Sequence, residues 1–311
     1  MSPARRRNVA ASVRDRLLAR ARERGEDFQL VLSRYAIERL LYRLSVSRYR
    51  DRFLLKGAML FLVWTGHVYR PTRDLDLLGR GSSNVATLER IFHEICAAEV
   101  GDDGLRFMGP VNGERIRDEE EYQGVRLTLT TLLGKARIPL QVDVGFGDVV
   151  HPAPTEAEFP VLLDHPAPRI RVYSRESVVA EKLHIMVDRG MANSRMKDFA
   201  DAFMLATTAE FEGEVLARAI AATFERRRTP VPIAPPLALT AEFAEDRAKQ
   251  TQWRAFDRRA RLNLGDQKLA EIVTLLRDFL MPPTEAAAGG RPFRSFWPAG
   301  GPWQTPPDTR R

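Results

Sequence analysis

Apolar residues recur along this chain with two periods, and each period predicts a different kind of element. Helical spacing predicts helices over residues 10–26, 27–49 and 84–98. The first is polar and arginine-rich, whereas the second has an apolar face that must pack on another element. The apolar stretch 54–64 predicts a further helix, which we expect to begin near Gly57.

Strict alternation of apolar and polar residues predicts strands over 70–78, 125–130 and 138–146. A turn at 133–136 joins the second of these strands to the third. In the third strand, Asp143 lies on the face opposite a row of apolar side chains. Strands and helices therefore mix in this half of the chain.

The strand over 70–78 alternates two carboxylates with leucines. Because successive side chains of a strand point to opposite faces, Asp74 and Asp76 share one face while Leu75 and Leu77 occupy the other. Two anionic groups on one face repel each other unless hydrogen bonds or a divalent cation lie between them. An isolated Asp-x-Asp pair is typical of a solvated edge strand, so its neighbours decide its meaning.

Asp143 is a third carboxylate that points away from a buried strand face. If its strand shares a sheet with Asp74 and Asp76, the three carboxylates can surround one or two magnesium ions. Such ions bind the phosphates of a nucleotide and stabilise the attacking and leaving oxygens of an in-line displacement. The sequence leaves open whether the strands are adjacent.

A proline-rich stretch without periodicity, residues 151–168, favours a domain boundary, and beyond residue 173 the pattern is mainly helical to about residue 280. The last thirty residues are rich in Pro and Gly, and we expect a loosely ordered tail in which Trp297 and Trp303 are candidates to dock. The expected parts are a basic helical N-terminal arm (1–50), an α/β core (51–168), a helical domain (169–281) and the tail (282–311).

Lys182 lies on the apolar stripe of a predicted helix, one turn from Val178 and one turn from Met186. A lysine in this position either extends its ammonium group outward to water or points it at a buried anion. The residues alone favour the first interpretation.

A helix over residues 193–201 brings charged residues together at three- and four-residue spacings. Arg195 can reach Asp198, and Lys197 can reach Asp201. Ordinary ion pairing within the helix explains this segment when it is considered alone.

The composition is that of a globular protein, with 44% hydrophobic residues in 311. No apolar run is long enough to span a bilayer, so we expect a soluble, cytoplasmic protein without membrane partners. The single cysteine, Cys96, excludes an internal disulfide and argues against cysteine-based zinc sites.

The net charge of +7 is concentrated at the N-terminus, because residues 1–50 contain 13 arginines and 5 acidic residues. A basic arm on a near-neutral body suits a polyanionic partner, although a solvated arginine-rich helix explains it equally well. Only 6 of the basic residues are lysines, and three of these, Lys56, Lys182 and Lys197, fall within the motifs. A compact ammonium group is not interchangeable with a guanidinium at a phosphate or titrating site.

Together, five short motifs in this order resemble those of the AbiEii-type nucleotidyltransferase toxins of abortive-infection, or type IV toxin–antitoxin, systems. The resemblance extends from about Phe28 to about Leu205. Its motifs are Leu55-Lys56-Gly57-Ala58, Arg70 to Leu78, Val142 to Asp148, Ala180-Glu181-Lys182, and Arg195 to Asp201.

The resemblance implies a polymerase-β-like nucleotidyltransferase fold, a mixed α/β sheet with helices, followed by a helical C-terminal domain. One departure is Ala58, where the family commonly has a second glycine or a serine, so that backbone amides of Gly57 and Ala58 must serve. The implied metal ligands are Asp74, Asp76 and Asp143; the implied catalytic set adds Lys182 and Asp198, with Asp201 less certain; and the implied nucleotide-binding residues are Lys56, Gly57, Ala58, Lys182, Arg195 and Lys197.

The same resemblance implies transfer of NMP from an NTP, with Mg2+ or Mn2+, to an RNA acceptor, the 3′ end of tRNA, which blocks translation. It also implies a winged-helix antitoxin from an adjacent gene. Two alternatives stay open: transfer to a hydroxyl of a protein or small molecule, and a non-catalytic module that binds nucleotide or RNA.

Overall fold

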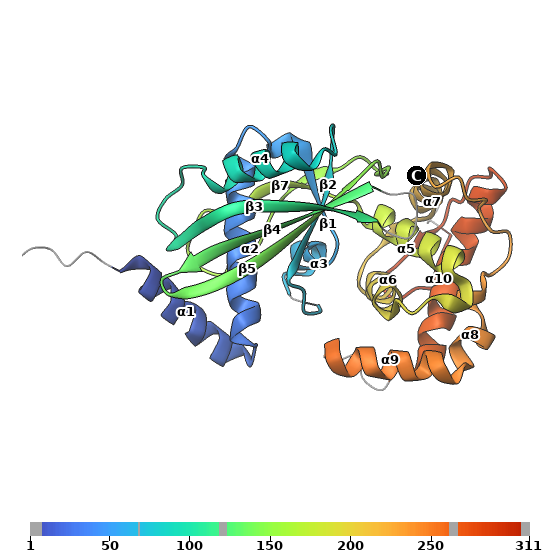
Figure 1. Ribbon diagram of the computed structural model, residues 1–311. Helices are drawn as coiled ribbons and strands as arrows, with labels where there is room; N and C mark the ends of the chain where they lie inside the picture. Colours follow the sequence, from blue (N-terminus) through green and yellow to red (C-terminus); the bar gives the residue numbers. More distant parts are fainter. Residues whose placement is uncertain (1–7, 68, 118–122, 261–266, 306–311) are drawn as a thin grey trace, which may run out of the picture. The chain divides into compact units, whose positions relative to one another are not determined.

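The computed structural model describes residues 8–67, 69–117, 123–260 and 267–305 (Figure 1). The chain divides into two compact units. Unit 1 contains residues up to 147 together with 155–172, and unit 2 contains 148–154 together with the residues from 173 onward. None of the helices in the described ranges is both long enough and apolar enough to cross a membrane.

Unit 1 is built on a mixed sheet, which has seven strands among the described residues, in the order β3-β4-β5-β2-β1-β7-β6. The pairs β2–β5 and β1–β7 are parallel and the other neighbours are antiparallel. This architecture confirms the expected mixed α/β fold. The strands are β1 (Phe53–Lys56), β2 (Asp74–Gly79), β3 (Leu105–Arg117), β4 (Gln123–Leu133), β5 (Ala136–Phe146), β6 (Thr155–Glu158) and β7 (Arg169–Val172).

The helices of unit 1 follow the predicted helical periods closely. Side-chain oxygens of Asn8, Asp27 and Asn84 cap three of the four by accepting a backbone N–H of the first turn. The helices are α1 (Val9–Arg24), α2 (Phe28–Val46), α3 (Met59–Thr65) and α4 (Val85–Cys96), with a short 3-10 turn η1 (Arg50–Arg52).

Two segments of unit 1 differ from the prediction. The helix expected to begin near Gly57 is present as α3, from Met59, but the apolar residues before it form strand β1, whose backbone pairs with β2 and β7. Strand β3 was not predicted. Its pairing register shifts between Met108 and Asn112, where Gly109 adopts a left-handed φ of 71° and interrupts the alternating pattern.

One face of the sheet is apolar and is covered by α2 and α4. The ring of Phe53 in β1 contacts Phe92 of α4 with centroids 5.3 Å apart. The guanidinium of Arg43 in α2 lies 4.9 Å from the ring centre of Phe107 in β3. The opposite face of the central strands carries the charged residues Lys56 and Asp76 next to the buried pair Leu54 and Leu78.

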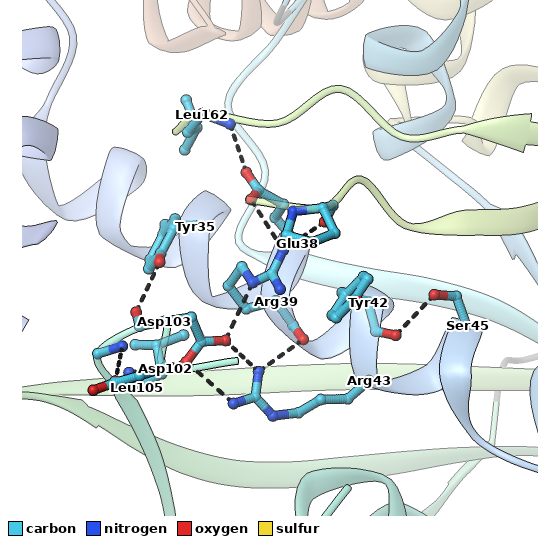
Figure 2. Close-up of polar contacts among 12 residues, drawn as sticks. Tyr35, Glu38, Arg39, Tyr42, Arg43, Ser45, Asp102, Asp103, Leu105 and Leu162 are labelled. Atoms are coloured by element: carbon cyan, nitrogen blue, oxygen red, sulfur yellow. Dashed lines mark hydrogen bonds and ion pairs between the residues drawn. The ribbon is translucent and has the colours of Figure 1, made fainter. Parts of the chain in front are cut away.

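Helix α2 also carries a buried polar network, drawn in Figure 2. The carboxylate of Asp103 accepts hydrogen bonds from Arg39 (3.1 Å) and Arg43 (2.6 and 3.2 Å), and its backbone carbonyl accepts one from Tyr35. Burial alone would raise the pKa of Asp103, but the hydrogen bonds and charge of Arg43 hold it below its ordinary value. The network ties α2 to the segment between α4 and β3.

These contacts show that some of the N-terminal arginines are not available to a polyanionic partner. Arg39 and Arg43 are buried and paired with Asp103, and Arg34 is buried beside Glu26 at 3.0 Å. Helix α1 also packs inward, through Val13, Leu17 and Ala21. Several of the charges that looked available to a polyanion therefore neutralise internal carboxylates.

Unit 2 is mainly helical, and its core contains Phe199, Phe224, Phe243, Phe279 and Trp297, all of which are buried. Its helices are α5 (Arg175–Arg189), α6 (Met196–Thr208), α7 (Gly213–Arg226), α8 (Ala241–Glu245), α9 (Arg247–Ala260) and α10 (Leu269–Ala288), with 3-10 turns η2 (Gly190–Ala192) and η3 (Leu237–Leu239) and a two-stranded sheet of β8 (Phe211–Glu212) and β9 (Phe296–Trp297).

The expectation of a loosely ordered tail from residue 282 is wrong for the part of it that the structure describes. Helix α10 continues through Pro282 and Pro283 to Ala288. The indole N–H of Trp297 then donates to the carbonyl of Ala206, at 2.7 Å. The prolines thus do not end the helix, and the indole ties the segment after α10 to α6.

Candidate functional site

Four charged side chains form one row across the central strands of unit 1. Lys56 of β1 pairs in register with Asp76 of β2, Asp76 pairs with Asp143 of β5, and Asp143 pairs with Arg126 of β4. Residues paired directly across neighbouring strands point to the same face of the sheet. The row therefore runs as cation, carboxylate, carboxylate, cation on one face.

Asp74 belongs to the same face, because it lies two residues before Asp76 in β2. Its partner in β5 is Gln141. The strands whose adjacency the sequence left open are thus parallel neighbours, and Asp143 lies on the same side of the sheet as Asp74 and Asp76.

The apolar residues of these strands fix the orientation of the acidic ones. Leu75 and Leu77 of β2 and Val142 and Val144 of β5 are almost fully buried on the opposite face. A slip of one residue in either strand would expose this apolar set and bury carboxylates, which is strongly unfavourable. Alternation therefore determines which way the acidic side chains point.

Gly57, which follows Lys56, has a left-handed φ of 72° and lies against the side chain of Asp76. A Cβ atom added at Gly57 would come 2.0 Å from Oδ2 of Asp76. The lysine–glycine element thus leaves room for the carboxylate. The following helix α3 is only seven residues long.

Arg126 donates hydrogen bonds to both carboxylate oxygens of Asp143. Arg126 Nε donates to Oδ1 and Arg126 Nη2 donates to Oδ2, each at 2.9 Å, and Gln141 donates to Oδ2 at 3.2 Å. The hydrogen bonds to Asp143 raise the pKa of Arg126 further above its ordinary value. The sequence interpretation missed Arg126, although it lies on the polar face of a correctly predicted strand.

The acidic residues of this face fit a hard divalent cation by donor type, since Mg2+ and Mn2+ prefer carboxylate oxygens. Within the described ranges, no three His, Cys, Asp or Glu side chains converge closely enough to hold a metal ion. Both carboxylate oxygens of Asp143 accept hydrogen bonds from Arg126.

In unit 2, Lys182 of α5 points at two buried carboxylates of α6. Its Nζ lies 2.9 Å from Asp198 and 2.9 Å from Asp201, and Asp198 also accepts a hydrogen bond from Arg195 Nε at 2.8 Å. Of the two interpretations of Lys182, contact with a buried anion is therefore correct, and the anions belong to the protein itself. The ion pair expected between Arg195 and Asp198 is confirmed.

In this network, the two cations beside Asp198 outweigh the effect of burial on its pKa. Burial of Asp198, which is 2% exposed, would raise its pKa, but Lys182 and Arg195 hold that pKa far below its ordinary value. Asp198 is thus an ionised carboxylate that orients two cations. Lys197, the remaining member of the predicted set in this helix, is exposed.

Asp148, the last residue of the Val142 to Asp148 motif, lies in unit 2 beside the start of α5. Its carboxylate accepts a hydrogen bond from the buried hydroxyl of Tyr173 at 3.3 Å and lies 3.5 Å from Arg227. Burial, Glu181 and Asp148 raise the pKa of Tyr173 well above its ordinary value. Sequence reasoning included Asp148 in a motif but assigned it no partner.

The mixed sheet with carboxylates on one face, preceding a helical unit, is a nucleotidyltransferase fold. The family model described as "Nucleotidyl transferase AbiEii toxin, Type IV TA system" matches residues 39–275, and the chain belongs to this family. It is therefore a nucleotidyltransferase of a toxin–antitoxin family.

Two solved structures from Helicobacter pylori are similar to the chain. One is JHP933, with 14% sequence identity, a TM-score of 0.47, and coverage of 85% of this chain and 94% of that protein. The other is a protein whose description suggests a nucleotidyltransferase, with 14% identity, a TM-score of 0.47, and coverage of 85% and 96%. Comparison with curated protein sequences found no match.

Proposed function

We propose that this protein is a metal-dependent nucleotidyltransferase that transfers NMP from an NTP to RNA, with the 3′ end of tRNA as acceptor, and thereby blocks translation as a toxin. The observation that carries the proposal is the register of β2 and β5. It aligns Asp76 with Asp143 on parallel neighbours, with Asp74 on the same face and Lys56 at the end of the row.

The residues of unit 1 have distinct roles in this proposal. Asp74, Asp76 and Asp143 would hold Mg2+ or Mn2+, and Lys56 would neutralise phosphate charge of the NTP. When bound, the cation would stabilise the charge of an in-line displacement in which pyrophosphate leaves. Gly57 has no Cβ atom and so leaves space for the carboxylate of Asp76. The backbone amides of Gly57 and Ala58 are proposed to contact phosphate.

Three residues of unit 2 retain, as a prediction, the nucleotide-binding role that the family resemblance implies, whereas we change the role of Asp198 from catalytic to positioning. Lys182, Arg195 and Lys197 are proposed to bind nucleotide. Asp198 supports this role indirectly, since its contacts with Lys182 and Arg195 make it a positioning residue. Asp201 shares the ammonium group of Lys182 and belongs to the same support.

The acceptor and the partner are proposed from the family and from charge. A toxin of a type IV system implies an antitoxin, for which we propose a winged-helix protein. Arginines of α1 that remain exposed, among them Arg14, Arg16 and Arg24, can contact phosphates of an RNA, and such binding weakens as salt rises.

The test combines the protein with α-labelled NTPs, Mg2+ and total tRNA. Label should move to tRNA with the wild type. Asp76→Asn or Asp143→Asn should lower transfer by more than about 100-fold, because loss of a metal ligand costs more than loss of an outer-shell partner, which costs up to about 100-fold. Circular dichroism and melting temperature should show both variants folded.

A matched control is Glu99→Gln, which removes an exposed carboxylate of unit 1 and should leave transfer unchanged. Label that accumulates on protein or on a small hydroxyl compound would replace the RNA acceptor with the corresponding alternative. Label that stays in free nucleotide with every acceptor would contradict transferase activity altogether.

A further inference from the structure

The guanidinium of Arg126 binds the carboxylate of Asp143, which the proposed function assigns as a metal ligand. Both oxygens of Asp143 accept an N–H from Arg126, in the two-pronged arrangement that is the strongest contact between these groups. The pair joins directly opposed residues of β4 and β5. Neither partner needs a special backbone conformation to make this contact.

Counting acceptor positions shows how little of Asp143 remains for a cation. An ionised carboxylate offers about four lone pairs, two on each oxygen. Oδ2 accepts from Arg126 and Gln141, and Oδ1 accepts from Arg126, so a single lone pair on Oδ1 is left. A cation that takes more than this lone pair has to displace an N–H donor.

The position of Arg126 also opposes a cation shared between Asp143 and Asp76. Asp143 stands between Asp76 on β2 and Arg126 on β4, and neighbouring strands lie about 4.8 Å apart. Attraction to Arg126 draws the carboxylate away from Asp76, whereas a shared cation requires it to approach Asp76. A guanidinium beside the carboxylate also repels a divalent cation.

The pair is accessible enough to separate. The side chain of Arg126 is 33% exposed and that of Asp143 is 18% exposed, so the guanidinium can move into water without breaking the packed core. The arginines that hold Asp103, by contrast, are almost fully buried and cannot move into water in this way.

We propose that Arg126 is a positioning residue that competes with a divalent cation for the carboxylate of Asp143. Arg126 neutralises Asp143 until the cation binds, and cation binding releases at least one of its N–H donors. This inference rests on the proposed function, because it takes Asp143 to be a metal ligand.

Calorimetric titration with Mn2+ alone tests the competition. Arg126→Gln should bind Mn2+ about 10-fold more tightly than the wild type, which corresponds to one charge-assisted hydrogen bond no longer opposing the cation. Its melting temperature without metal should fall, and the rise of melting temperature on adding Mn2+ should be larger than in the wild type.

Two further variants separate release of the carboxylate from simple loss of charge. Arg126→Lys keeps the charge but cannot engage both oxygens, so it should also bind Mn2+ more tightly than the wild type, though less than Arg126→Gln. Arg137→Gln removes an exposed arginine elsewhere on β5 and should leave Mn2+ affinity unchanged.

The wild-type protein provides a second readout, for which a variant serves only to assign one resonance. The Arg126 Nε–H resonance, assigned from the Arg126→Lys spectrum, should shift when Mg2+ is added. Unchanged or weaker Mn2+ affinity of Arg126→Gln, or an unmoved resonance at saturating Mg2+, would overturn the competition and leave the proposed function intact. Absence of Mn2+ binding by wild type and variant alike would overturn both.

Discussion

The carboxylate of Asp76 lies so close to the Cα atom of Gly57 that no side chain fits between them. Gly57 is therefore a glycine for two reasons, its φ of 72° and the 2.0 Å separation between Oδ2 of Asp76 and the position of a Cβ atom. This relationship explains the glycine of the lysine–glycine motif through the geometry of unit 1, independently of any contact with phosphate.

Gly57→Ala should destabilise unit 1 by about 1–3 kcal/mol and should also impair transfer, because Asp76 must move. The control is Gly66→Ala, since Gly66 has the same φ of 72° but open space around its Cα atom. Gly66→Ala should incur the backbone strain alone and should keep its activity. Urea unfolding and the transfer assay measure the two effects, and equal loss of activity in both variants would contradict the role of Gly57.

Glu38 gives the stability of unit 1 a predictable dependence on pH. Burial raises its pKa from 4.5 to about 7, and although Oε2 accepts the N–H of Leu162 at 2.7 Å, Oε1 has no hydrogen-bond partner. Because the folded state holds this proton more tightly than the unfolded chain, its contribution is fully present below pH 4.5 and is lost as pH rises through about 7.

Glu38→Gln should remove this dependence and keep an acceptor for Leu162. The free energy of unfolding of the variant, relative to the wild type, should increase by up to about 3 kcal/mol between pH 4 and pH 8. Urea unfolding at intervals of pH measures it. Parallel curves for the two proteins would contradict the burial of an ionising Glu38.

Asp198 should support the fold of unit 2 before it supports any chemistry. Asp198→Asn removes the carboxylate that pairs with Arg195 and one of the two that hold Lys182, and should cost about 3 kcal/mol of unfolding free energy. The control Glu225→Gln changes an exposed carboxylate of α7 and should cost less than about 0.5 kcal/mol. Full stability of Asp198→Asn combined with lost activity would instead favour a direct catalytic role.

The pH dependence of this effect has the opposite sign to that of Glu38. The folded pKa of Asp198 is depressed by Lys182 and Arg195 against the effect of burial. Its contribution is therefore present above the ordinary aspartate pKa of 3.8 and is lost as pH falls towards the folded value. Below pH 4 the wild type should lose stability more steeply than Asp198→Asn, which acid unfolding followed by circular dichroism can measure.

Trp303 compensates for a proline inside α10. Pro283 has no N–H for the carbonyl of Phe279, one turn earlier, and the indole N–H of Trp303 donates to this oxygen at 2.9 Å. Trp303→Phe should leave the carbonyl without a donor, at a cost of about 1–3 kcal/mol.

Pro283→Ala supplies the missing N–H, so the Trp303→Phe substitution should cost less in that background. A double-mutant cycle by urea unfolding isolates this coupling. Additive effects would show that the indole contributes by packing on Phe279 alone.

Much of the sheet could be predicted from local patterns. The alternation in β2 and β5 identified which residues face which way, because burial of Leu75 and Val144 leaves no other choice. Strand β3 was missed because its register shift and Gly109 disturb the period of two. The arginines of α2 were misread because charge counts do not reveal that Asp103, sixty residues away, neutralises two of them.

By itself, the sequence determined the alternation of strands β2 and β5, most of the helices, and the family, because these depend on short spacings along the chain. Only the tertiary structure decided that Asp76 stands beside Asp143, that Arg126 engages both oxygens of Asp143, and that Lys182 binds internal carboxylates. Strand order and side-chain pairing join residues far apart in the chain, and no local period encodes them.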